Sequence, residues 1–303
     1  MARRTSSRAS FGRVFLKAAS AWWNDNAMRL GASLSFYTVF AIAPVLLVAI
    51  AIAGLAFGPE AVRGELVGQM DGLVGREGAL AVQALLEGAS KRQASVLATI
   101  LGTVSFMFTA TTAFLELQAA LNAIWRVAPN PDANWTAFLR DRVRSFGLVV
   151  GIGFLLLVSL VISAAISAAS AWVGRQTPGW PIVAQGLNTT VSFLVTATLF
   201  AMLFKFLPDV KLEWRHVATG AIVTAVLFTI GKHLIGLYLA RSATASSYGA
   251  AASVMLLLLW VYYSSQILLF GAEFTRIYAA SMGERPKPEE FAERDPKAAI
   301  KAT

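Results

Sequence analysis

Polar and ionisable side chains recur at helical spacing within otherwise apolar stretches of this sequence. One stripe steps by four, three and four positions and ends in a carboxylate: Ser105, Thr109, Thr112 and Glu116. A second stripe shares one helical face: Tyr262, Gln266 and Glu273. Side chains three or four positions apart are neighbours on a helix surface. Polar faces of this kind inside apolar helices are typical of sites that bind or pass a polar group.

A third stripe has no ionisable member and consists of Gln185, Thr189, Ser192 and Thr196, with Asn188 beside it. Each stripe either lines a cavity or serves close packing between helices. A stripe that ends in a carboxylate is harder to explain by packing, because burying an unpaired charge is costly. Both interpretations therefore stay open for the stripes that end at Glu116 and Glu273.

Two single residues inside apolar stretches also attract attention. Lys232, next to His233, either extends its ammonium group towards the membrane surface or faces a cavity, where it would hold an anionic head group. Pro44 lacks an N–H group and clashes with the preceding helical turn, so it can bend a helix. Such a bend is either a static kink or a gating joint.

Six long apolar segments must position these residues. Each has at least the roughly 20 residues that a helix needs to cross a bilayer. The segments cover residues 31–57, 96–117, 146–173, 182–204, 216–240 and 249–274. The chain of 303 residues is 56% hydrophobic and 14% charged, whereas about a quarter of an average soluble domain is charged. We therefore expect an all-α polytopic membrane protein with six transmembrane helices.

The distribution of basic residues predicts the topology. Most of the 26 lysines and arginines lie in the N-terminal segment, in alternate connections and in the tail. Cytoplasmic segments retain basic residues, so both termini are expected in the cytoplasm. We assign the net charge of +9 to topology and to contact with anionic lipid rather than to nucleic acid.

Three regions follow from this topology. Residues 1–30 form a cytoplasmic N-terminal segment, in which Phe11, Val14, Phe15, Ala18 and Trp22 predict an amphipathic helix in the membrane interface. Residues 31–275 form the transmembrane domain, with an external amphipathic segment at 58–95. Residues 276–303 are charged and poor in apolar side chains, so we expect a disordered cytoplasmic tail.

Two of the membrane carboxylates are expected at the same depth. The second and sixth segments run towards the cytoplasm, which brings Glu116 and Glu273 near the level of Arg29, Arg126 and Arg276. These groups either form a charge cluster that closes the inner end of the helix bundle or remain separate pairs at the surface.

The composition argues against an enzyme. There are no cysteines, which excludes thiolate metal sites and cysteine nucleophiles. The two histidines, His216 and His233, are expected on opposite sides of the membrane, and no glycine-rich phosphate loop is present. We therefore predict no catalytic residues, no cofactor and no metal site.

Several stretches together resemble the YihY/BrkB family of bacterial inner-membrane proteins. They are Ala32–Thr38 with Pro44, Asn122–Trp125, Leu207–Val210 with Gly220, Tyr248–Gly249, and Trp260–Tyr262 through Gly271–Glu273. The resemblance covers residues 20–280 and implies a six-helix, multi-pass protein of the bacterial inner membrane that is linked to envelope integrity. Some members carry the label ribonuclease BN, but this sequence lacks the clustered histidine and aspartate ligands that such a metal-dependent nuclease needs.

The leading hypothesis is a transporter or flippase-like protein for an anionic envelope lipid or amphipathic solute. The alternative is a non-catalytic scaffold or assembly factor for envelope biogenesis, which would dock partners on segment 58–95 and on the basic tail. An ion or small-solute channel is a third reading. The expected partners are anionic membrane lipids and envelope proteins, and the sequence leaves the oligomeric state open.

Overall fold

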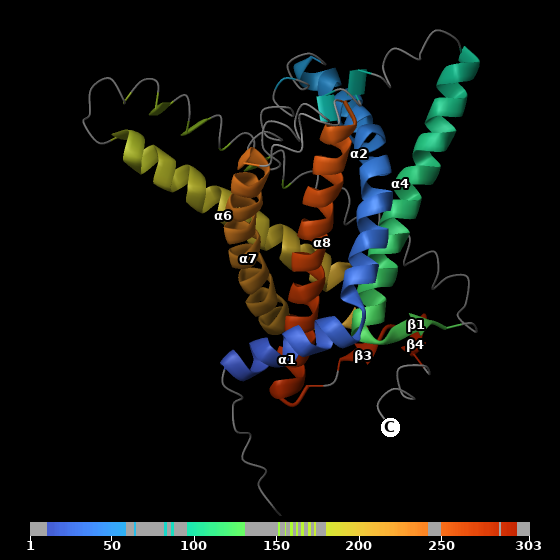
Figure 1. The fold of residues 1–303 in the computed structure, drawn as a ribbon, viewed down its shortest axis with the longest axis vertical. Coiled ribbons are helices and arrows are strands. Elements are labelled where there is room, and N and C mark those ends of the chain that lie inside the picture. Colours follow the sequence, from blue (N-terminus) through green and yellow to red (C-terminus); the bar gives the residue numbers. More distant parts are fainter. Residues whose placement is uncertain are drawn as a thin grey trace, which may run out of the picture. The chain divides into compact units, whose positions relative to one another are not determined.

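The computed structural model describes residues 11–58, 64, 82–83, 86–87, 96–130, scattered positions from 151 to 173, and residues 180–241, 250–284 and 286–295. Its helices are α1 (Phe11–Asn24), α2 (Ala27–Phe57), α4 (Val96–Trp125), α6 (Trp180–Phe206), α7 (Trp214–Arg241) and α8 (Ala250–Ser281) (Figure 1). The short strands are β1 (Val127–Pro129), β2 (Val210–Lys211), β3 (Lys287–Pro288) and β4 (Ala292–Arg294). Five helices therefore coincide with five of the six expected segments. The segment 146–173 falls mostly outside the described residues, and the positions described there are helical.

Three of the described helical stretches are long and apolar enough to cross a membrane. They are Ile182–Phe206, Trp214–Ile235 and Val254–Ser281. In these stretches apolar side chains lie on most sides of the helix. This is typical of a helix that contacts lipid or other helices all round. The six-helix count and the side on which each terminus lies stay predictions.

The chain divides into two compact units. The first, called the α1 unit, contains α1, the end of α4 from Leu121, α6, the beginning of α7 up to Thr229, the end of α8 from Leu268, and the four strands. The second, called the α2 unit, contains α2, the rest of α4, the end of α7 and the beginning of α8.

In the α1 unit, helix α1 lies across the end of α8 (Figure 1). Val14 and Ala18 are buried against Phe274, and the Phe15 ring lies 5.0 Å from that of Phe270. The apolar face that the sequence assigned to the membrane interface is thus only partly covered by protein, since Phe11 on that face is 56% exposed. Leu16 and Trp23 of α1 are also exposed.

Helices α7 and α8 approach each other through two reciprocal glycine–threonine contacts. A Cβ atom on Gly220 of α7 would lie 1.8 Å from Oγ1 of Thr275, and one on Gly271 of α8 would lie 2.0 Å from Oγ1 of Thr224. Each threonine hydroxyl donates to the carbonyl four residues earlier, Thr224 to Gly220 and Thr275 to Gly271, both at 2.7 Å. The hydroxyls are therefore satisfied within their own helices while the backbones pack closely.

The C-terminal segment is ordered as far as Asp295, which corrects the expectation of a disordered tail. Helix α8 continues to Ser281, β3 pairs with β2, and β4 pairs with β1, both antiparallel. The registers join Val210 to Pro288 and Val127 to Arg294. Backbone pairing with the connections after α4 and α6 thus stabilises a segment that has few apolar side chains of its own.

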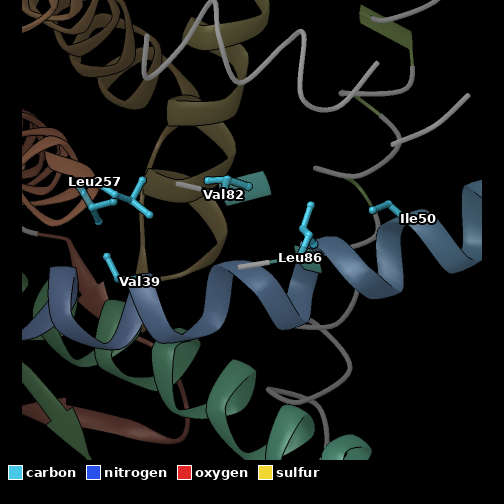
Figure 2. Close-up of a cluster of buried hydrophobic side chains, with 6 residues drawn as sticks. Val39, Ile50, Val82, Leu86 and Leu257 are labelled. Atoms are coloured by element: carbon cyan, nitrogen blue, oxygen red, sulfur yellow. The ribbon is translucent and has the colours of Figure 1, made fainter. Parts of the chain in front are cut away.

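The α2 unit has a buried apolar cluster between α2 and α8. Figure 2 shows Val39 and Ile50 of α2 and Leu257 of α8 together with Val82 and Leu86 from segment 58–95. Val82 and Leu86 are both 1% exposed, so these two residues of segment 58–95 serve as packing elements. Helix α2 runs through Pro44 without interruption, and the side chain of that proline lies outside the described residues.

Candidate functional site

Four charged residues of the α1 unit form an ionic cluster, consisting of Asp25, Arg126, Glu273 and Arg276. Arg276 donates two hydrogen bonds to Oε2 of Glu273, from Nη2 at 2.6 Å and from Nε at 3.0 Å. Both arginines also reach Oδ2 of Asp25, Arg126 at 3.4 Å and Arg276 at 3.4 Å. One carboxylate is therefore held firmly, whereas the other is shared by two longer contacts.

The side chains of this ionic cluster differ in exposure, from fully buried Glu273 to partly exposed Arg126. The side chain of Glu273 is 0% exposed, those of Arg276 and Asp25 are each 20% exposed, and that of Arg126 is 40% exposed. Oε1 of Glu273 is buried and has no hydrogen-bond partner among the described residues. A buried charge is stable only when partners compensate for its lost hydration. Arg276 supplies that compensation on one oxygen of Glu273 and leaves the other free.

Two left-handed residues at helix ends position the cluster. Asn26 has a φ of 56° and separates α1 from α2, while Arg126 has a φ of 56° and ends α4. Asparagine tolerates this conformation, but a long arginine adopts it at a cost of about 1–3 kcal/mol. The tail offsets that cost, since the amide of Asp295 donates to the carbonyl of Arg126 at 3.0 Å. Strained backbone thus turns Asp25 and Arg126 towards each other.

A second buried polar contact fastens the end of α4. Nδ2 of Asn122 donates to Oδ2 of Asp209 at 2.6 Å, and the amide of Asp209 donates back to Oδ1 of Asn122 at 2.9 Å. Asn122 is 7% exposed and Asp209 is 6% exposed. These residues belong to two of the stretches on which the family resemblance rests. The pair joins those stretches across 87 positions of sequence.

Glu116 is described with the α2 unit, where its partner is a serine of α2. Ser33 of α2 donates to Oε1 of Glu116 at 2.5 Å, and Glu116 belongs to the α2 unit. In the same unit Gln266 of α8 packs against Gly31, whose Cβ atom would lie 2.1 Å from Nε2 of Gln266. Positions 31 and 33 are about 200° apart around α2. Glu116 of α4 and Gln266 of α8 therefore contact α2 on opposite sides.

The other candidate site residues from the sequence differ in their exposure. Lys232 and Tyr262 are half-buried, and so is Thr112, whereas Asn188 is exposed on α6. Gly231, beside Lys232, allows the hydroxyl of Tyr263 to approach, since a Cβ atom there would lie 2.5 Å from it. The side chain of Thr109 lies outside the described residues, although its backbone is helical.

Sequence reasoning did not identify the roles of four carboxylates: Asp25, Asp209, Glu213 and Glu284. Asp25 is the one acidic residue that precedes Glu60, in a basic segment, which is a usable signal. Asp209 carried no local signal, because its partner lies in a distant helix. Glu213 and Glu284 were also overlooked. Together with His216 they are, within the described residues, close enough to share a metal ion.

The geometry of the ionic cluster suits binding of anions rather than bond chemistry. Two guanidinium groups converge on one carboxylate oxygen, and guanidinium groups recognise carboxylate and phosphate in the same planar manner. Arg126 is the more accessible of the two. An anion that reached it would compete directly with Asp25.

Comparison with known proteins gives the family. The chain matches the model of the virulence factor BrkB family over residues 18–296. It is 32% identical over 251 residues to a UPF0761 membrane protein of Ralstonia nicotianae, covering 82% of this chain and 54% of that protein. It is 30% identical over 269 residues to one of Rhodospirillum centenum, covering 86% and 56%, and 30% identical over 270 residues to one of Azotobacter vinelandii, covering 87% and 62%.

The chain thus spans between 54% and 62% of the length of these relatives. No solved structure matches the chain. The matched region includes both halves of the Asn122–Asp209 contact and every residue of the ionic cluster. The apolar helices are consistent with relatives that are membrane proteins. The chain belongs to the virulence factor BrkB family of integral membrane proteins.

Proposed function

We propose that this protein transports an anionic envelope lipid or amphipathic anion across the bacterial inner membrane, with the ionic cluster as its gate. The observation that carries the proposal is Glu273, a carboxylate with 0% exposure on a helix apolar enough to span a membrane. Ionisable groups at membrane depth are costly and mark substrate or ion pathways. A passive scaffold has no need of such a group.

The proposed gate opens at its weaker contacts. Asp25 is held at 3.4 Å by each arginine, whereas Glu273 receives two shorter bonds from Arg276. An incoming phosphate or carboxylate head group would replace Asp25 between the arginines. Since Arg276 stays bound to Glu273, the exchange preserves the buried pair and displaces only Asp25, which directly follows α1.

The location of this gate follows from the charge distribution. The N-terminal segment and the tail are both basic, which favours a cytoplasmic position for the ends of the chain. The ionic cluster would then face the inner leaflet. In that leaflet anionic lipids attract basic segments, so the most exposed cluster residue, Arg126, would meet the head group first.

Lipid movement in reconstituted vesicles tests this function. Purified protein is placed in liposomes that contain a fluorescent anionic phospholipid, and the fraction of label accessible to an external quencher is followed with time. Arg126→Ala and Arg276→Ala should abolish movement. Arg29→Ala is the matched control, because this arginine is exposed and does not belong to the ionic cluster; it should retain movement.

Two outcomes would reject transport. The first is folded wild-type protein that moves neither the anionic lipid nor a soluble amphipathic anion. The second is equal activity of the Arg126, Arg276 and Arg29 variants. In either case the scaffold alternative gains, and it predicts that cluster variants support normal envelope integrity in cells while deletion of residues 62–88 does not.

A further inference from the structure

A second group of ionisable residues in the α1 unit is not used by the proposed gate. Glu213 directly precedes α7, His216 lies in its first turn, and Glu284 follows the end of α8. Each offers one ligand atom, and these atoms all lie within 4.8 Å of one another. The group therefore combines an imidazole with two carboxylates drawn from distant parts of the chain.

The backbone holds the three residues in place. The carbonyl of Glu213 accepts the amides of His216 at 3.1 Å and Val217 at 3.2 Å, which begins the helix. At the end of α8, Gly283 adopts a φ of 86°, its amide donates to Ala280, and the amide of Glu284 donates to Ala279, each at 3.1 Å. This is a Schellman cap. It directs Glu284 back towards the start of α7.

The imidazole makes this group more than a pair of surface acids. His216 is 1% exposed, and its Nδ1 lies 3.0 Å from Oε2 of Glu284. Its ring also packs edge-on against Tyr278 at a centroid distance of 5.9 Å, which restricts its rotation. A nitrogen and two carboxylates that converge in this way repel one another unless a proton or a cation lies among them.

The guanidinium group of Arg215 is the cation nearest to this group among the described contacts, and it neutralises the carboxylates only weakly. Nη2 of Arg215 lies 3.5 Å from Oε1 of Glu284, but the arginine side chain is 70% exposed. Exposed pairs of this kind contribute little. Among the described residues Arg215 pairs with Glu284 but not with Glu213, so a cation can still bind between Nδ1 and the two carboxylates.

The donor set fits a divalent transition metal. Zinc binds histidine nitrogen and carboxylate oxygen at about 2.0–2.2 Å, which places tetrahedral ligands roughly 3.4 Å apart. The 3.0 Å separation of Nδ1 from Oε2 is close to that value, and exposed Glu213 can rotate to complete the set. Imidazole with carboxylates also suits manganese and iron, and the ligand softness excludes copper(I).

We infer that Glu213, His216 and Glu284 form a divalent metal site that fastens the segment after α8 to the start of α7. The site is independent of lipid transport. With three protein ligands, the coordination would be completed by water from the side of Glu213. Binding would stabilise the C-terminal segment against separation from α7, because a ligand that binds only the folded arrangement favours it.

Metal content of the purified protein tests the inference. Untagged protein in detergent is incubated with Zn²⁺, freed of excess metal and analysed by elemental mass spectrometry. Wild-type protein should retain one Zn²⁺ per chain. His216→Ala should retain none, and His233→Ala is the matched control because the chain has only two histidines; it should bind as wild type does.

Two further variants keep the test valid if His216→Ala does not fold. Glu213→Gln changes an exposed side chain and should weaken Zn²⁺ binding at least tenfold by losing one anionic ligand. Arg215→Ala should strengthen it by about two- to fivefold, the effect of removing one weak exposed pair. Absence of retained Zn²⁺ in wild-type protein, or equal retention by His216→Ala and His233→Ala, would overturn the inference.

Discussion

Replacing Gly220 with alanine should disrupt the close approach of α7 and α8. A Cβ atom at this position would lie 1.8 Å from Oγ1 and 2.9 Å from Cβ of Thr275. Thr275 is 0% exposed and its hydroxyl is bonded to the carbonyl of Gly271 at 2.7 Å. The threonine therefore has no free space to move into and would lose its hydrogen bond by rotating.

The magnitude follows from three opposing effects. Overpacking a buried site costs about 1–3 kcal/mol, and loss of the threonine hydrogen bond costs about 0.5–1.5 kcal/mol. Alanine has a better helix propensity than glycine by about 1 kcal/mol. The net loss of unfolding free energy is about 2 kcal/mol. For a chain of this size such a loss lowers the Tm by about 3 °C.

Thermal unfolding of the purified protein, followed by the fluorescence of its eight tryptophans, measures this change. Gly186→Ala in α6 is the matched control, because no atom lies within 4 Å of the added Cβ, and its Tm should equal or exceed that of wild type. Thr275→Ala in the Gly220→Ala background removes the hydroxyl clash and should restore part of the loss.

A Gly220→Ala protein as stable as Gly186→Ala would refute this reasoning. The same conclusion would follow if Thr275→Ala lowered the Tm of Gly220→Ala by as much as it lowers that of wild type. Either result would mean that the backbones of α7 and α8 are further apart at this level than the structure places them.

Three further predictions use the same melting assay. Asn122→Ala removes both bonds to buried Asp209 and should cost about 2–3 kcal/mol; a Tm equal to wild type would show that this contact contributes nothing. A chain ending at Glu284 lacks β3 and β4 and should melt below one ending at Asp295, which keeps both pairings; identical melting would contradict the ordered tail. Glu273→Leu leaves Arg276 without its two shortest bonds and should cost about 3 kcal/mol, whereas Glu273→Gln keeps an acceptor and should cost less; the reverse order would count against a paired carboxylate.

Hydropathy predicted the described helices well, but it ended two of them, α4 and α8, too early. Helix α4 continues from the expected end at 117 to Trp125, and α8 continues from 274 to Ser281. The added turns carry Asn122 and Arg276, whose polar groups interrupt the apolar pattern. These turns remain helical while tertiary partners, Asp209 for Asn122 and Asp25 for Arg276, satisfy those polar groups. A search for apolar segments therefore ends before it reaches Asn122 and Arg276.

The sequence left two arrangements open for the charged residues at this depth, a cluster or separate pairs at the surface. Within the α1 unit, Glu273 pairs with Arg276, and Asp25 joins Arg276 to Arg126. Within the α2 unit, Glu116 accepts a hydrogen bond from Ser33. Depth along a helix can be counted from the sequence at about 1.5 Å per residue, but the direction in which a side chain points depends on how each helix is rotated against its neighbours.

The sequence alone determined the membrane class and the position of the apolar helices, because these depend on local composition and on short-range backbone preferences. Only the tertiary structure decided which polar groups meet. The Asn122–Asp209 contact, the two glycine–threonine contacts and the pairing of β3 and β4 join segments that are distant in the chain. Their stability comes from long-range packing and from satisfying buried polar groups, and no local pattern in a single sequence records which partner each group will find.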